Sequence, residues 1–107
     1  MEIKEIEVFS DATNTSIVRM PNRGFPGVVI HGDSLSIFFD QTMTLVEKLA
    51  NFEDEEVFLT ALEMAERIEA HLLHYEETLQ ADGITLPYVR DLKRSPSKYA
   101  HRWNNND

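Results

Sequence analysis

The sequence predicts an α+β fold: a three-stranded antiparallel sheet followed by two packed helices, in the order βββαα, and a basic C-terminal tail. Three observations predict it. Short β-branched segments separated by turn residues fill the first 31 positions, two stretches of helical periodicity follow, and cysteine is absent. A chain of 107 residues buries enough apolar surface to fold as one domain without disulfides. We therefore expect a single domain over residues 1–89 and a loosely ordered basic tail over residues 90–107.

Three short strands are expected at the N-terminus. The alternation of the first segment predicts a strand that turns Ile6 and Val8 towards the core. Residues 16–20 are expected to form the second strand and residues 27–31, a β-branched run, the third. The loop between these two strands holds two prolines and two glycines in seven residues, which restricts its conformation. Hairpin-like spacing makes an antiparallel sheet the simplest assembly.

The first helix is expected to begin in the stretch Gly32-Asp33-Ser34. The side chain of Asp33 or Ser34 can accept a hydrogen bond from a free amide of the first turn, and we expect Ser34 to be the cap. Because the chain turns sharply at both ends of the third strand, we also expect a positive φ at Gly27 or Gly32. One face of the helix is apolar over about 160°, which suits a helix covering the sheet on one flank and a second helix on the other. The residues of this face are Phe38, Phe39, Met43, Leu45, Val46, Leu49 and Ala50.

The second helix is expected from about Asp54 to Ala81, with Gly83 as a natural C-terminal stop. Its apolar residues stay within an arc of about 80° on an ideal helix, and this arc predicts the face that packs on the first helix. They are Val57, Ala61, Ala65, Ile68, Leu72, Tyr75 and Leu79. Residues 84–89 are expected to be extended and to pack back on the body.

Residues 32–35 spell Gly-Asp-Ser-Leu, which resembles the nucleophile motif of a family of serine esterases. The resemblance implies a nucleophilic role for Ser34. A serine nucleophile needs a neighbouring base, an orienting carboxylate and an oxyanion hole, and that family supplies the first two as Asp-x-x-His. No Asp stands three residues before His71, His74 or His101. We therefore expect Ser34 to cap a helix and the protein not to be an enzyme.

His71 and His74 are three residues apart on the second helix, a spacing that can share a metal ion. Both lie off the apolar stripe, and no Glu stands three residues before either, so we interpret them as solvated histidines. The sequence also has no phosphate-binding loop and no cysteine. We expect neither a metal site nor a cofactor.

The charge is distributed unevenly along the chain. Residues 1–89 hold five basic and 17 acidic side chains, a balance of −12, and residues 90–107 hold five basic and two acidic ones, a balance of +3, which together give the net −9. An acidic body repels phosphate backbones and attracts basic proteins, so nucleic acid is not expected as a partner. The same net charge also serves solubility alone.

No apolar stretch reaches the ~18 residues of a membrane span. The N-terminus has no basic region followed by an apolar run, so no signal peptide is predicted. We expect a bacterial protein of the cytoplasm that has no contact with a membrane.

Several short motifs resemble an uncharacterised family of small bacterial domains. They are Ser-Asp-Ala-Thr-Asn at residues 10–14, Arg-x-Phe-Pro-Gly-Val-Val-Ile-x-Gly-Asp-Ser-Leu with Gly24 as the variable residue after Arg23, and Gly-Ile-x-Leu-Pro at residues 83–87. The resemblance covers residues 5–88. It implies a shared fold without a known activity.

A local resemblance connects residues 16–50 with HicB-type antitoxins, in which Pro-Gly ends a loop, a strand follows and Gly-Asp-Ser opens a helix. That family continues with a fourth strand and a DNA-binding segment. This sequence departs from it, because residues 53–82 have helical periodicity and no helix-turn-helix or ribbon-helix-helix segment follows. The resemblance therefore does not extend to DNA binding.

The leading functional hypothesis is a small acidic protein-binding module, such as an immunity or antitoxin-like protein that neutralises a basic nuclease. Opposite the apolar stripe of the second helix, carboxylates surround a leucine with no inward partner, and such a surface suits a cationic site. The predicted surface comprises Glu56, Leu59, Glu63, Glu66 and Glu77. An ordinary solvated helix face explains the same pattern.

The alternative hypothesis is a ligand-binding or enzymatic domain with a pocket formed by Arg23, Phe25, His31 and Ser34, which crowd into one loop region. Fixed loop geometry explains this density as well. A third interpretation is a homodimer formed through the sheet edge or through the first helix, where Ile37 points away from the core.

The tail is expected to dock loosely on the acidic second helix. Exposed ion pairs are weak and are screened by salt, so docking also requires Tyr99 and Trp103 to bury apolar area. Their i, i+4 spacing predicts a short helix. If that helix covers Leu59, Glu63 and Glu66, the tail masks the predicted partner surface.

Overall fold

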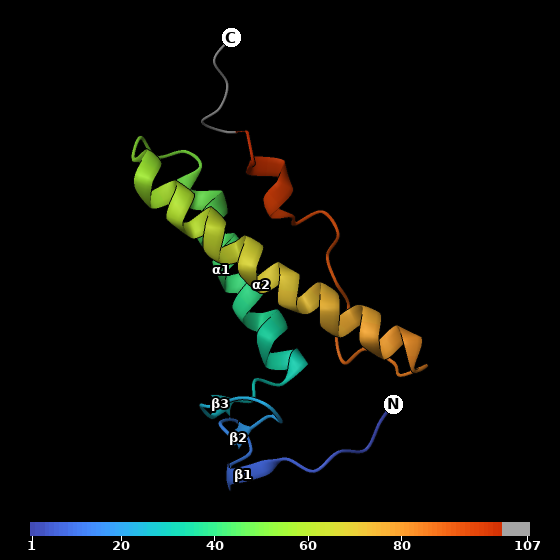
Figure 1. Ribbon diagram of the computed structural model, residues 1–107. Helices are drawn as coiled ribbons and strands as arrows, with labels where there is room; N and C mark the ends of the chain where they lie inside the picture. Colours follow the sequence, from blue (N-terminus) through green and yellow to red (C-terminus); the bar gives the residue numbers. More distant parts are fainter. Residues whose placement is uncertain (102–107) are drawn as a thin grey trace.

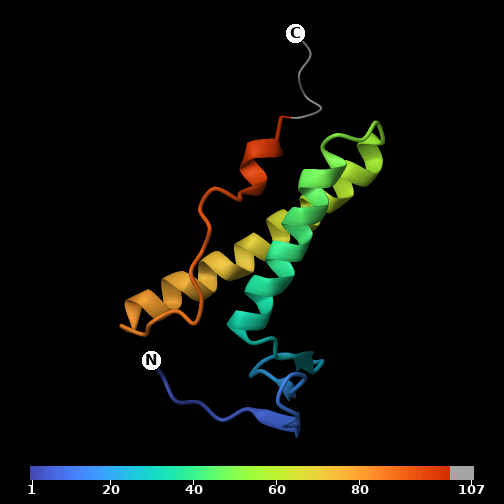
Figure 2. The same ribbon diagram turned by 180° about the vertical axis from the view of Figure 1, so that it is seen from behind.

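The computed structural model describes residues 1–101 as three strands, two long helices and a short 3₁₀ helix (Figure 1, Figure 2). The predicted α+β class and the order βββαα are confirmed. The two long helices form an antiparallel hairpin, and the sheet lies beyond the end of the hairpin where α1 begins and α2 ends. The elements are β1 (Glu7–Ser10), β2 (Ile17–Arg19), β3 (Gly27–Val28), α1 (Gly32–Leu49), α2 (Glu55–Ala81) and η1 (Pro96–Tyr99).

The sheet has the strand order β1-β2-β3 with antiparallel pairs. Val18 of β2 pairs with Val8 of β1, and Ile17 of β2 pairs with Val28 of β3. An irregularity between Val8 and Ser10 shifts the register of the first pair. Directly opposed residues share a face of a sheet and successive residues alternate between faces. Val8 and Val18 therefore lie on one face, and Ile17 and Val28 lie on the other.

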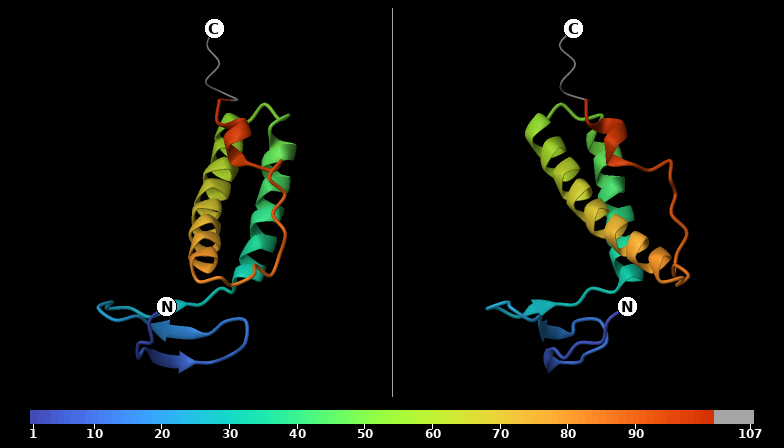
Figure 3. Two further views of the ribbon diagram at one scale, coloured as in Figure 1. Left: turned by 90° about the vertical axis from the view of Figure 1, so that its right-hand side faces the viewer. Right: turned by 45° about the vertical axis from the view of Figure 1, so that its right-hand side comes forward.

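Most apolar side chains of the sheet region are exposed. Ile6 leaves 41% of its surface accessible, Val8 57% and Phe9 56%. The predicted inward orientation of Ile6 and Val8 is therefore wrong. The reason is the position of the sheet, which lies beyond the end of the hairpin instead of under a flank of α1, so neither of its faces meets the helical core (Figure 3).

Helix α1 begins without the predicted Ser34 cap. His31 occupies the N-cap position in an extended conformation, with φ −69° and ψ 148°, and its side chain makes no cap hydrogen bond. The carboxylate of Asp33 instead accepts a hydrogen bond from the Ser34 amide at 2.8 Å. Ser34 does not cap the helix because it is already the third helical residue, inside the first turn.

Helix α2 begins and ends where the sequence predicts. The Asp54 carboxylate caps its first turn by accepting a hydrogen bond from the Val57 amide at 3.1 Å. Two residues after the helix, Gly83 adopts φ 68°. This left-handed conformation stops helices readily, and glycine adopts it without a steric cost.

Gly32 is needed for space rather than for an unusual φ. Neither Gly27 nor Gly32 has a positive φ, which contradicts the prediction. A Cβ atom on Gly32 would overlap the ring of Tyr75, whereas a Cβ atom on Gly27 would meet nothing within 4 Å. The absent side chain of Gly32 therefore allows the first turn of α1 to lie against α2.

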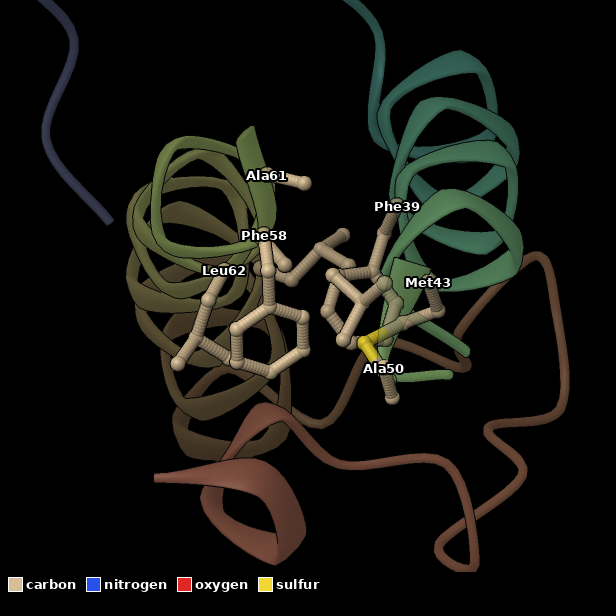
Figure 4. Close-up of a cluster of buried hydrophobic side chains, with 9 residues drawn as sticks. Phe39, Met43, Ala50, Phe58, Ala61 and Leu62 are labelled. Atoms are coloured by element: carbon tan, nitrogen blue, oxygen red, sulfur yellow. The ribbon is translucent and has the colours of Figure 1, made fainter. Parts of the chain in front are cut away.

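The hydrophobic core lies between α1 and α2 (Figure 4). Phe39 and Met43 of α1 face Phe58 of α2 across the hairpin. The buried apolar residues are Phe39, Met43, Val46, Ala50, Phe58, Ala61, Leu62, Ala65 and Leu72. Phe38 and Leu45, which the sequence places on the apolar face of the first helix, are 45% and 52% exposed because the sheet does not cover that flank.

The buried face of α2 is rotated relative to the predicted stripe. Val57 is 44% exposed, whereas Phe58 and Leu62 are buried. On an ideal helix this moves the centre of the buried face by about 50°. The ring of Tyr99 meets the ring of Phe58 edge-on with centroids 6.5 Å apart, so residues after α2 cover a second flank of the helix. The predicted stripe is misplaced because it assumes that only α1 covers α2.

Residues 84–101, which we call the strap, run back along the hairpin from the end of α2 to the α1–α2 turn (Figure 3). Tyr88 stacks on Tyr75 with ring centroids 6.4 Å apart, and Pro96 at the start of η1 is buried. Packing on the hairpin therefore continues past residue 89, where the sequence predicts the tail to begin. Trp103, on the predicted tail helix, lies outside the described residues.

Candidate protein-interaction surface

The predicted partner surface lies along the exposed side of α2, and the structure adds Leu73 to it; we call the enlarged surface the outer face of α2. Leu59 and Leu73 leave 42% and 43% of their surfaces accessible. From Glu56 to Glu77 it extends over 21 positions. At 1.5 Å per helical residue, this is about 31 Å. The outer face comprises Glu56, Leu59, Glu63, Glu66, Leu73 and Glu77.

The carboxylates of this face are largely uncompensated. Helix α2 carries seven acidic residues and one arginine. Within residues 1–101, Glu56, Glu66 and Glu77 form no ion pair, and Glu63 pairs with Arg67 at 2.9 Å. Both partners of that pair are mostly exposed, so it adds little to stability. The outer face therefore presents negative charge to solvent.

Two other carboxylates of α2 lie under the strap. Arg90 is 3.5 Å from Glu69 and 3.5 Å from Glu76, and the three side chains are only 15%, 20% and 13% exposed. The Tyr88 hydroxyl donates to Glu76 at 2.9 Å. The Arg90 guanidinium also lies 5.1 Å from the centroid of the Phe39 ring. Burial raises the pKa of Tyr88, and the hydrogen bond to Glu76 raises it further, so the phenol stays protonated and keeps donating.

Arg94 fastens the strap to α1. Its Nε and Nη2 atoms donate to the two carboxylate oxygens of Glu47, both at 2.9 Å. Nη2 also donates to the Thr44 hydroxyl at 2.9 Å, and Asp40 lies 3.8 Å from Nη1. The hydrogen bonds to Glu47 are the main reason that the pKa of Arg94 is raised. This bidentate pair holds the strap in one register along the hairpin.

The described strap leaves the outer face of α2 uncovered, which contradicts the predicted masking. Arg90 and Arg94 contact carboxylates that lie outside that face. Tyr99 packs against the core instead of against Leu59. With the strap in place, the carboxylates under it are largely shielded from water, so their ion pairs are screened less than pairs on the outer face are.

The residues of the alternative ligand pocket are not brought together. Arg23 and Phe25 line a hollow of about 500 Å³ beside the sheet. His31 instead donates from Nε2 to the Thr13 carbonyl oxygen at 2.9 Å, because a carbonyl oxygen only accepts. Within residues 1–101, no histidine hydrogen-bonds the hydroxyl of Ser34. In this part of the chain, the Gly-Asp-Ser-Leu motif therefore lacks the hydrogen-bonded histidine that a serine nucleophile uses.

A second hollow of about 500 Å³ separates the sheet from α2. Val28 and Ile30 line it on the side of the sheet, and His71, His74 and Tyr75 line it on α2. Among residues 1–101 there is no group of three or more His, Cys, Asp or Glu side chains that could hold a metal ion. Both histidines are exposed to solvent at the rim of this hollow.

Sequence reasoning missed Leu73 and the two carboxylates that bind Arg90. At 100° per residue on an ideal helix, Leu73 lies only about 40° from Leu59. The helical periodicity therefore could have placed Leu73 on the outer face. Glu69 and Glu76 fall on the flank of α2 next to Phe58. That flank is recognised as buried only once the strap is known to cover it.

A family model described as Family of unknown function (DUF6959) matches residues 1–88. The chain belongs to this family. The DUF6959 match agrees with the predicted membership of an uncharacterised domain family, and it spans the sheet, both long helices and the strap as far as Tyr88. It includes the whole outer face of α2 and ends before Arg90. No curated protein and no solved structure matches the chain.

None of the helices within residues 1–101 is long and apolar enough to cross a membrane.

Proposed function

We propose that this DUF6959 protein is a small acidic, non-enzymatic protein-binding module of the bacterial cytoplasm, which neutralises a basic protein partner as immunity proteins and antitoxins do. The observation that carries the proposal is the division of the acidic side chains between two surfaces. Carboxylates under the strap are paired with Arg90 and Arg94. Glu56, Glu66 and Glu77 on the outer face of α2 have no basic partner within residues 1–101.

The outer face of α2 has both charge and apolar area to offer a cationic partner. The net charge of −9 steers basic proteins towards the chain and speeds their encounter. Leu59 and Leu73 add apolar contact area between the carboxylates. Affinity depends mostly on such desolvated anchors, because exposed ion pairs contribute little by themselves. The core packing of α2 holds all of these side chains on one rigid element.

The length and the negative charge of the row of carboxylates on the outer face would let it neutralise a basic partner. Proteins that act on nucleic acids bind phosphates through Lys and Arg side chains. A row of carboxylates about 31 Å long lies against such a basic groove and competes with the phosphate backbone for it. The module needs no catalytic residue of its own for this role.

Charge reversal on two surfaces tests the proposal. The outer-face variant combines Glu63→Lys with Glu66→Lys, and the control variant makes the same charge change with Glu5→Lys and Asp11→Lys, which are exposed in the N-terminal region. Each full-length protein is immobilised and offered a lysate of its source cell. We expect the wild type and the control to retain the same basic protein, and the outer-face variant to lose it. The purified partner is then inhibited by the wild type and by the control only.

Leu59→Ala separates contact from electrostatic steering. We expect this variant to associate at the wild-type rate and to dissociate faster, whereas charge reversal mainly slows association. Two results contradict the proposed function. One is equal capture of the partner by the wild type, the outer-face variant and the control variant, and the other is loss of capture with the control variant only.

A further inference from the structure

The chain exposes more surface than a folded monomer of its mass does. Its accessible area is 8303 Å². The mass scaling of monomeric proteins gives about 6100 Å², so the excess is about 2200 Å². The radius of gyration is 17.0 Å. A compact chain of this length has a radius of about 13 Å. The sheet contributes to both differences because it extends beyond the hairpin instead of packing under it (Figure 3).

The side of the sheet that faces away from α2 is apolar and uncovered. Val28 borders the hollow next to α2, and Val8 and Val18 lie on the opposite side, which we call the distal face. Val8 is 57% exposed and Met20, just after β2, is 54% exposed. Phe25, in the adjoining loop, is 88% exposed. A sheet of three short strands is stable only when a hydrophobic face is packed, so the distal face requires a cover.

The charge distribution favours a second copy of this chain as the cover. Residues 1–31 carry four acidic and three basic side chains, a net −1, whereas residues 32–89 carry 13 acidic and two basic ones, a net −11. Two copies that met through their helices would bring like charges together. Two copies that met through their sheets would be nearly neutral at the contact, so repulsion there is small.

We propose that the distal face of the sheet binds the distal face of a second copy, forming a symmetric homodimer. In such a contact both copies supply the same residues. A standard interface takes about 800 Å² from each partner, which is less than the excess of about 2200 Å² on each chain. Val18, Met20 and Phe25, with Arg23 and Val28 at the β3 edge, line a hollow of about 500 Å³ that receives apolar side chains of the other copy. The outer face of α2 remains free on both copies.

Sedimentation equilibrium of the full chain over a concentration series tests the proposal. The wild type is compared with two variants, each of which replaces one exposed valine by aspartate. Val8→Asp places a charge on the distal face, and Val57→Asp places the same charge on an exposed position of α2. We expect the wild type and Val57→Asp to sediment with twice the monomer mass of 12.4 kDa, and Val8→Asp to sediment as the monomer. Phe25→Asp repeats the test in a loop, where no strand contact is lost. Circular dichroism verifies that each variant keeps its helices.

Three outcomes overturn the homodimer. The first is a wild type that is monomeric at every concentration, including the case in which a different protein covers the sheet. The second is dimers of both Val8→Asp and Phe25→Asp. The third is dissociation of Val57→Asp to the same extent as Val8→Asp.

Discussion

Phe58 on α2 has no accessible surface, whereas Phe9 on β1 leaves 56% of its surface exposed. The same contrast separates the regions to which they belong. In the hairpin, nine apolar residues are buried and the strap packs against them. No residue of β1, β2 or β3 is buried. The contacts that stabilise a single chain therefore lie mainly in the hairpin and its strap, and the sheet leaves most of its apolar side chains exposed.

The ion pairs of the two regions differ in the same way. Arg90 and Glu76 are 15% and 13% exposed, whereas Arg19 of β2 and Glu7 of β1, 2.6 Å apart, are 33% and 63% exposed. Water screens the pair on the sheet and screens the pair under the strap much less. This difference predicts that equivalent substitutions have unequal effects in the two regions.

The largest difference is expected for the two phenylalanines. Phe58→Ala empties a fully buried site, so we expect it to lower the free energy of unfolding by about 3–5 kcal/mol. Phe9→Ala removes a mostly exposed ring and its stacking on Arg19. We expect that change to cost less than about 1 kcal/mol when the chain is dilute. Urea unfolding followed by the helical signal measures both values, and equal costs contradict the contrast between the regions.

The next comparison is between two arginines that pair with carboxylates of α2, Arg90 from the strap and Arg67 from the helix itself. Arg90→Met leaves Glu69 and Glu76 under the strap without a basic partner, and we expect a loss of about 2–4 kcal/mol. Arg67→Met breaks an exposed pair with Glu63. This control is expected to cost less than about 0.5 kcal/mol. If the two variants unfold at the same urea concentration, the strap does not depend on its arginine.

Two glycines test close packing in the same manner. Gly32→Ala pushes a methyl group against Tyr75, and we expect a loss of about 1–3 kcal/mol, the usual cost of overpacking. Gly27→Ala meets open space at an ordinary φ, so it should leave stability nearly unchanged. Thermal unfolding of the two variants distinguishes them. A Gly32→Ala protein as stable as the wild type would show that α1 does not need this close approach.

The smallest expected effect concerns the pH response of the sheet. The hydrogen bonds from Arg19 lower the pKa of Glu7. A carboxyl group with a lower pKa in the folded chain contributes stability that is present above its ordinary pKa and is lost as the pH falls through the lowered value. An NMR titration should find the pKa of Glu7 below the ordinary glutamate range, and Arg19→Gln should return it to that range. An ordinary pKa of Glu7 in the wild type contradicts the pairing of β1 with β2 through these side chains.

The parts of the fold that depend on local chemistry were predictable from the sequence. Helix α2 starts after Asp54 and stops before Gly83, as predicted. A capping carboxylate and a glycine in the left-handed conformation each depend only on neighbouring residues in the sequence. The predicted Ser34 cap of α1 is wrong, because the helix begins two residues earlier and His31 occupies the N-cap position without a side-chain cap hydrogen bond. The strand order also followed from the short spacing of the hairpins.

The parts that depend on distant segments were not predictable. The alternation of the first segment suggests a strand with Val8 on its buried side. Alternation alone does not reveal that the sheet lies beyond the hairpin, where Val8 is exposed. Glu69 and Glu76 look like surface residues until Arg90 is placed against them. The outer face of α2 was located correctly as an exposed face, because its carboxylates and Leu59 recur with the helical period. Its role in partner binding remains the proposal that charge reversal tests.

Hydrogen exchange of the backbone amides at two protein concentrations tests the division of the molecule most directly. Amides in the middle of α2, around Leu62 and Leu72, should be equally protected at both concentrations, because the core that buries them belongs to one chain. Amides of β1 and β2 should become protected only at the higher concentration, where a second copy covers the distal face. Exchange of the β1 and β2 amides at the same rate at both concentrations would contradict the dependence of the sheet on a second chain.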